Sequence, residues 1–235
     1  MTPSFQQTGR TAAAAGILML VGVEGEWVLN PQADDGTVTN PPVFALLVLS
    51  ATIGFALLLL AVRGLRVQAS TTKAARVGAL LSLAGAGLLV AFGLTSLSTA
   101  LLTGSPLEAA FVAFLLGMLL LSVGPITWAL SLRGPTPAPG LRQMLFLSGA
   151  AGLAALALEA DPWHDLSLVV TYMAWTVLGV LLLRGGGHSA TGESGRTVRA
   201  LALHRKSAAQ GSRAPLDRNG REQALWRLTD GGHAP

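Results

Sequence analysis

Cysteine is absent from this sequence of 235 residues, and charged residues make up only 12% of it. Without cysteine the chain has neither disulfide bonds nor thiolate-bound metal sites. A soluble domain usually has about 25% charged residues, so a soluble fold of this length would expose large apolar patches. Hydrophobic residues make up 51% of the chain. This composition predicts an integral membrane protein.

The sequence also contains none of the common catalytic motifs. It has no His-Glu-x-x-His zinc motif, no Gly-x-Ser-x-Gly nucleophile and no glycine-rich phosphate loop. Of its four histidines, only His164 lies near an apolar segment, and the others lie in the last 50 residues. The sequence therefore predicts no catalytic residue and no cofactor.

Six apolar stretches are long enough to cross the hydrocarbon core of a bilayer, which requires about 20 residues in a helix. Pairs such as Asn-Pro, Gly-Pro and Asp-Pro lie between them, as expected where helices end. We therefore predict an all-α protein in which residues 1–184 form a bundle of six transmembrane helices. The predicted helices cover residues 12–29, 43–62, 74–101, 109–132, 141–160 and 166–183.

Lysine and arginine occur in or beside alternate connections between these stretches. Arg10 precedes the first stretch, and the other basic residues lie at the second and fourth connections or after the sixth stretch. The acidic residues that precede residue 184 show the reverse pattern and lie in or beside the first, third and fifth connections. Basic residues collect in loops that stay in the cytoplasm. The pattern predicts a multi-pass protein of the plasma membrane with both termini in the cytoplasm.

The six predicted helices pair into three hairpins whose ends resemble one another. The hairpins end in Val62-Arg63-Gly64, Leu132-Arg133-Gly134 and Leu183-Arg184-Gly185. A weak threefold repeat explains this resemblance. Chance also explains it, because membrane topology and helix capping both favour Arg-Gly at a cytoplasmic helix end.

Small residues share one face of the first, third and fifth predicted helices. Such residues allow close approach of helix backbones in lipid, where packing drives association. The even-numbered helices are richer in leucine and valine. We therefore predict a central cluster of the three odd-numbered helices, packed through the following residues: Ala15 and Gly22; Ser82, Ala86, Gly93 and Ser96; Ser148, Gly152 and Ala155.

One group of ionisable residues near the predicted outer surface is a candidate ion or proton site. Carboxylates and an imidazole can bind a cation or relay protons, although the sequence does not identify a metal. Glu24 and Glu26 are about 200° apart around a helix, so they cannot serve one site together; Glu26 and Glu159 are the pair expected to approach. The alternative is a set of interfacial carboxylates solvated by water. The candidate residues are Glu24, Glu26, Glu159, Asp161, His164 and Asp165.

Residues 185–235 are rich in glycine, serine, arginine and alanine and predict a flexible cytoplasmic tail, because they cannot bury enough apolar surface to fold alone. Residues 197–206 can form a short basic helix, whose Arg199, Arg205 and Lys206 would contact the anionic inner leaflet. A plain solvated tail is the alternative. With a single aromatic residue, the tail is not expected to bind nucleic acid.

Three interpretations of function follow. The favoured one is a non-enzymatic membrane module that packs with protein or lipid partners, because the middle of the predicted spans carries hydroxyl groups and no charge. The second is a small transporter or an ion or proton pathway that uses the acidic residues. The third is a membrane enzyme acting at the outer face. A high content of arginine, alanine, leucine and glycine is typical of GC-rich bacterial genomes.

Overall fold

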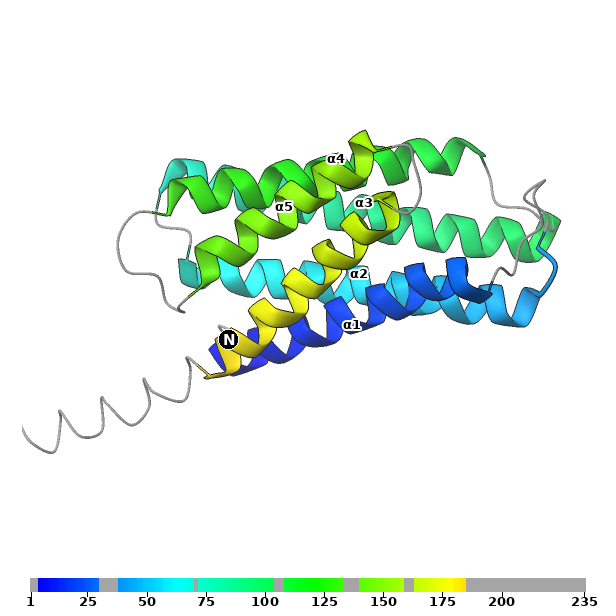
Figure 1. The fold of residues 1–235 in the computed structure, drawn as a ribbon, viewed down its shortest axis with the longest axis horizontal. Helices are drawn as coiled ribbons and strands as arrows, with labels where there is room; N and C mark the ends of the chain where they lie inside the picture. Colours follow the sequence, from blue (N-terminus) through cyan, green and yellow to red (C-terminus); the bar gives the residue numbers. More distant parts are fainter. Residues whose placement is uncertain are drawn as a thin grey trace, which may run out of the picture. The chain divides into compact units, whose positions relative to one another are not determined.

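The computed structural model describes residues 4–29, 38–69, 72–103, 108–132, 140–158 and 163–184. Every regular element in these ranges is helical, as Figure 1 shows, and each coincides with one of the six predicted helices. The predicted tail lies outside the described residues, together with Arg199, Arg205 and Lys206. The helices are α1 (Phe5–Leu29), α2 (Pro41–Ala69), α3 (Lys73–Thr103), α4 (Glu108–Ser131), α5 (Leu141–Ala157) and a last helix, Trp163–Arg184.

Four of these helices are long and apolar enough to cross a membrane. The helix α1 is not one of the four; it has 25 residues but carries Arg10, Glu24 and Glu26. The helix α5 has 17 residues, fewer than the usual span. The prediction of six spans is therefore supported for four helices: Pro41–Gln68, Lys73–Ala100, Phe111–Ser131 and Trp163–Arg184.

Polar caps extend two helices beyond their predicted starts. Ser4 and Gln7 exchange side chain–backbone hydrogen bonds of 3.1 and 3.2 Å, a capping box that starts α1 seven residues before the expected position. The backbone N–H of Ala75 donates to the Thr72 hydroxyl at 3.1 Å, which caps α3. Counting apolar residues finds the buried middle of a helix and misses these polar ends.

The helices pack in chain order, since each of α1 to α4 contacts the next helix along the chain. The last helix contacts α1, where a Cβ atom built on Gly16 would lie 2.6 Å from the carbonyl oxygen of Tyr172. It also contacts α5, because a Cβ on Gly140 would lie 3.0 Å from Leu181. These contacts between successive neighbours close the six helices into a ring.

The predicted central cluster of odd-numbered helices is wrong. Among the labelled helices, α1, α3 and α5 share no pair of Cα atoms within 8 Å. Their predicted small residues pack instead on even-numbered neighbours: Gly93 of α3 lies against Thr52 of α2, and Gly152 of α5 lies against Ser122 of α4. The even-numbered helices supply their own glycines, which the prediction overlooked among bulkier residues.

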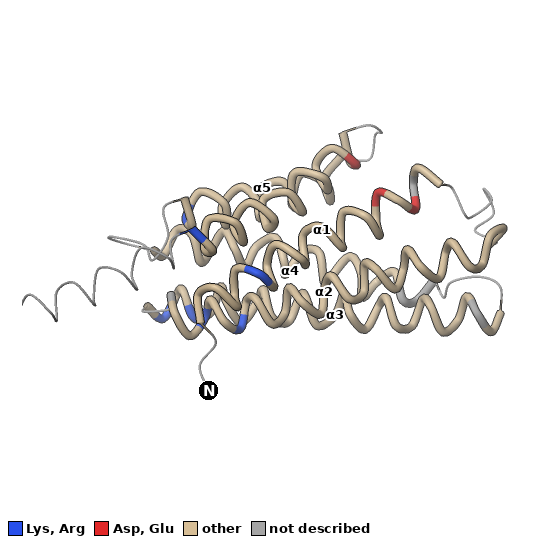
Figure 2. Tube along the Cα trace, turned by 90° about the horizontal axis from the view of Figure 1, so that it is seen from below, with Lys and Arg blue, Asp and Glu red and all other residues tan. Residues whose placement is uncertain are grey.

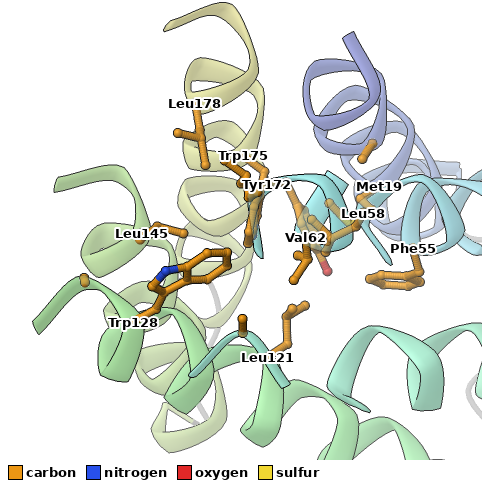
Figure 3. Close-up of a cluster of buried hydrophobic side chains, with 14 of the residues drawn as sticks. Met19, Phe55, Leu58, Val62, Leu121, Trp128, Leu145, Tyr172, Trp175 and Leu178 are labelled. Atoms are coloured by element: carbon orange, nitrogen blue, oxygen red, sulfur yellow. The ribbon is translucent and has the colours of Figure 1, made fainter. Parts of the chain in front are cut away.

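Large apolar side chains fill the centre of the ring. Trp128, Tyr172 and Trp175 are almost completely buried there, together with Met19 and Leu58 (Figure 3). The outward faces of the helices are also apolar, so the described surface is not that of a soluble bundle. Exposed examples are Leu46, Leu60, Val112, Leu130, Phe146 and Val177.

Charged residues lie at the two ends of the helices, as Figure 2 shows. We call one end the basic end; its described residues include Arg10, Arg63, Arg66, Lys73, Arg76, Arg142 and Arg184. We call the other the acidic end; it carries Glu24, Glu26 and Asp165. No Lys, Arg, Asp or Glu lies in the described ranges 11–23, 43–62, 77–103, 109–132, 143–158 and 166–183.

Candidate functional site

The acidic end brings together residues of α1 and of the last helix. The two helices run in opposite directions, with Gly16 beside Tyr172. Glu24 follows Gly16 by eight residues, or about 12 Å, and therefore reaches the level of residue 164 on the other helix. Glu24 accordingly lies within electrostatic range of both His164 and Asp165.

The orientation of α1 separates Glu24 from Glu26. Glu24 lies eleven residues after Ala13 and so shares its helix face; Ala13 packs against Gly179 of the last helix. Glu26 lies four residues after Gly22, which packs against Ala51 of α2. The structure therefore turns Glu24 toward the last helix and Glu26 toward α2. The expected approach of Glu26 to Glu159 stays a prediction, because Glu159 lies outside the described residues.

Three oxygen atoms near this junction are buried without a hydrogen-bond partner in the described part of the chain. They are Oε1 of Glu24, Oδ2 of Asp165 and Oη of Tyr172. Buried polar atoms in folded proteins nearly always have a partner. Glu24 and Asp165 are only partly buried as residues, so the site borders the surface, whereas Tyr172 has no exposed surface.

Tyr172 was missed by the sequence reasoning, which considered it only as one of the hydroxyl groups in the middle of the spans. It lies seven residues after Asp165 and therefore on the same face of the last helix, with the buried Leu168 between them. Side chains on a helix lean toward its amino-terminal end, which here is the acidic end. Tyr172 is also within electrostatic range of Glu24. The spacing of seven from Asp165 was the signal available in the sequence.

His164 is held against the end of α5. Its Nδ1 atom lies 2.7 Å from the carbonyl oxygen of Ala155. A carbonyl oxygen only accepts hydrogen bonds, so Nδ1 carries the proton and donates it. This arrangement leaves Nε2 able to accept a proton or to coordinate a ligand.

The described residues do not contain a cluster of three or more His, Asp or Glu side chains that could hold a metal ion. Of the predicted site residues, Glu24 interacts electrostatically with His164 and Asp165, and Glu26 lies on another helix face. Asp161, like Glu159, lies outside the described residues.

Hydroxyl groups in the predicted spans bond mainly to backbone carbonyls. Thr52, Ser82 and Ser122 each donate to the carbonyl four residues earlier, at 2.6 to 2.9 Å. Ser50 of α2 donates across to the carbonyl of Leu18 in α1, at 3.1 Å. These bonds satisfy the hydroxyls within the packed helices.

Comparison with protein-family models, with curated proteins and with solved structures gave no match.

Proposed function

We propose that this chain is a six-span protein of the bacterial plasma membrane, with both termini in the cytoplasm, that serves as a non-enzymatic module packing with protein or lipid partners. The observation that carries the proposal is the separation of basic and acidic residues to opposite ends of an apolar bundle (Figure 2). Basic residues favour the cytoplasmic side of a membrane, so the basic end is assigned to the cytoplasm.

The lengths of α1 and α5 are compatible with two further spans. The 25 residues of α1 extend about 38 Å and those of α5 about 26 Å. The hydrocarbon core is about 30 Å thick, and a shorter helix is accommodated by local thinning of the bilayer. Both helices are members of the same ring as the four clearly apolar helices. The charged residues of α1 lie at both ends of the bundle, and Arg142 of α5 lies at the basic end.

The non-enzymatic part of the proposal rests on the sequence, which has no catalytic motif, and on the lipid-compatible outer surface. Exposed leucine, valine and phenylalanine side chains surround the bundle. In a bilayer these side chains contact acyl chains, which makes lipid the first partner of the protein.

The absence of cysteine makes the topology directly testable, because a single introduced cysteine has no background. Gln143→Cys places an exposed thiol at the basic end, and Thr103→Cys places one at the acidic end. A membrane-impermeant maleimide applied to intact spheroplasts should label Thr103→Cys alone and should label Gln143→Cys only after permeabilisation. Labelling of Gln143→Cys in intact spheroplasts would contradict the proposed orientation.

A second candidate function is an ion or proton pathway. The electrostatic interaction of Glu24 with His164 and Asp165 at one end of the bundle favours it. An ionisable group at the edge of a membrane protein's interior often marks such a pathway. Uptake of protons or of radioactive sodium by proteoliposomes, compared with empty liposomes, tests this function separately from topology.

A further inference from the structure

Near the basic end, α1 and the last helix are in backbone contact. A Cβ atom built on Gly9 would lie 2.8 Å from the carbonyl oxygen of Gly179 and 3.0 Å from the backbone nitrogen of Leu183. A Cβ atom on Gly179 would in turn lie 2.6 Å from the carbonyl oxygen of Gly9. The two helices therefore approach closely at this point, next to Arg10 of α1 and Arg184 of the last helix.

Arg10 and Arg184 lie on the same side of this contact. Arg10 directly follows Gly9, Arg184 directly follows Leu183, and one residue advances about 100° around a helix. The helices run in opposite directions, so their turns have opposite senses when both are viewed from the basic end. The two arginines are therefore turned to one side of the plane that contains both helix axes. Both side chains are exposed, which makes this the outer side of the ring.

The two side chains also converge along the helix axes. Gly9 lies between the levels of Gly179 and Leu183, so Arg10 lies deeper in the bundle than Arg184. Helix side chains lean toward the amino-terminal end of their helix. This direction is toward the basic end for α1 and away from it for the last helix. The two guanidinium groups therefore lean toward a common level.

Apolar side chains continue the exposed face of each helix from the arginine toward the middle of the bundle. Ile17 and Val21 follow Arg10 by seven and eleven residues, and Val177 precedes Arg184 by seven, spacings that keep one helix face. Ile17 is 51% exposed, Val21 52% and Val177 40%. A ligand with an anionic head and acyl chains matches this order of charged and apolar groups.

The positive charge of the pair has no acidic counterpart nearby. Within the described ranges, no aspartate or glutamate lies at the basic end (Figure 2). Two guanidinium groups on adjoining helices repel each other, and an anion between them removes this repulsion. Arginine presents a planar fork of N–H donors that matches the oxygens of a phosphate group. Basic sites between membrane helices on the cytoplasmic side can hold anionic lipid head groups in this way.

We propose that Arg10 and Arg184 together bind the phosphate group of one anionic phospholipid, whose acyl chains lie along the outer faces of α1 and the last helix. The proposal deepens the proposed function by naming the class of lipid that this chain takes as a partner, and it rests on the assignment of the chain to a membrane.

The test measures thermal unfolding of the purified full-length protein in a neutral detergent, followed by tryptophan fluorescence. Trp128 and Trp175 are almost completely buried, so their emission should change on unfolding. Phosphatidylglycerol is titrated against phosphatidylcholine of the same acyl chains, whose head group has no net charge. Glycerol 3-phosphate is the third arm and supplies the phosphate without acyl chains. A ligand that binds only the folded state raises the midpoint temperature progressively with its concentration.

The expected result is a saturable rise of the midpoint temperature with phosphatidylglycerol alone. Arg10→Gln and Arg184→Gln should each raise the apparent dissociation constant about tenfold, the equivalent of 1.4 kcal/mol. Because both side chains hold one phosphate, the double variant should lose less than the product of the two single effects. Arg76→Gln is the matched control: it removes an exposed arginine at the same end from α3, which has no contact with α1, and should preserve the response.

Three results would overturn the proposal. Equal rises with phosphatidylglycerol and phosphatidylcholine would mean that the head-group charge is not recognised. An equal loss in Arg76→Gln would mean a diffuse attraction to the whole basic end. The same rise with glycerol 3-phosphate at equal concentrations would mean a site for soluble phosphate.

Native mass spectrometry of the wild type gives an answer that does not depend on the folding of any variant. It should detect one phosphatidylglycerol molecule retained in preference to phosphatidylcholine, and retention without preference would refute the site. None of these results bears on the membrane topology, which the maleimide experiment decides independently.

Discussion

The contact between α3 and α4 gives a quantitative test of the packing. A Cβ atom on Gly78 would lie 2.6 Å from the backbone nitrogen of Trp128 and 2.7 Å from the carbonyl oxygen of Gly124. Both neighbours are backbone atoms, so Gly78→Ala cannot be accommodated by rotation of a side chain. The two helices must move apart along a contact that also includes Gly85 and Gly117.

The magnitude follows from two opposing effects. Overpacking a well-packed interior typically costs about 1–3 kcal/mol, whereas replacing glycine with alanine in a helix contributes roughly 0.5–1 kcal/mol of stability. Gly78→Ala should therefore lower the free energy of unfolding by about 1 kcal/mol, within a range of roughly 0–2.5 kcal/mol. Gly87→Ala in the same helix is the control, because the nearest atom to its added Cβ, Cδ1 of Leu59, lies at 3.9 Å. It should be neutral or stabilising.

Unfolding of both variants by sodium dodecyl sulfate in mixed micelles, followed by tryptophan fluorescence, measures this difference. The expected order of stability is Gly87→Ala equal to or above the wild type, and Gly78→Ala below it. If Gly78→Ala were as stable as Gly87→Ala, the close contact between α3 and α4 would be wrong.

Two further predictions use the same assay. Ser4→Ala removes the capping box of α1 and should destabilise the protein by about 1 kcal/mol, whereas Gln6→Ala, at an exposed position of the first turn, should have little effect; equal effects would argue against the cap. Leu58→Ala removes a side chain with no exposed surface and should cost about 2–5 kcal/mol. Leu46→Ala in the same helix removes one that is 68% exposed and should cost far less; a reversed order would mean that α2 is rotated about its axis.

At the acidic end, helix periodicity predicts how the two glutamates of α1 are arranged relative to each other, but not which neighbouring helix each one faces. The sequence alone places Glu24 and Glu26 on opposite sides of one helix, because two residues advance about 200° around its axis. It does not say which side meets another helix. The contacts of Ala13 with Gly179 and of Gly22 with Ala51 decide that Glu24, and not Glu26, faces the last helix.

The sequence by itself determined the helical class and the approximate position of all six helices, because each apolar run must satisfy its backbone hydrogen bonds internally in a membrane. It also determined that charge is confined to the helix ends. The tertiary structure decided which helices touch. A small residue permits close approach to any neighbour with a matching depression, so Gly93 and Gly152 predict a tight contact without identifying its partner. Only the fold shows that α2 supplies the partner of Gly93, through Thr52, and that α4 supplies the partner of Gly152, through Ser122.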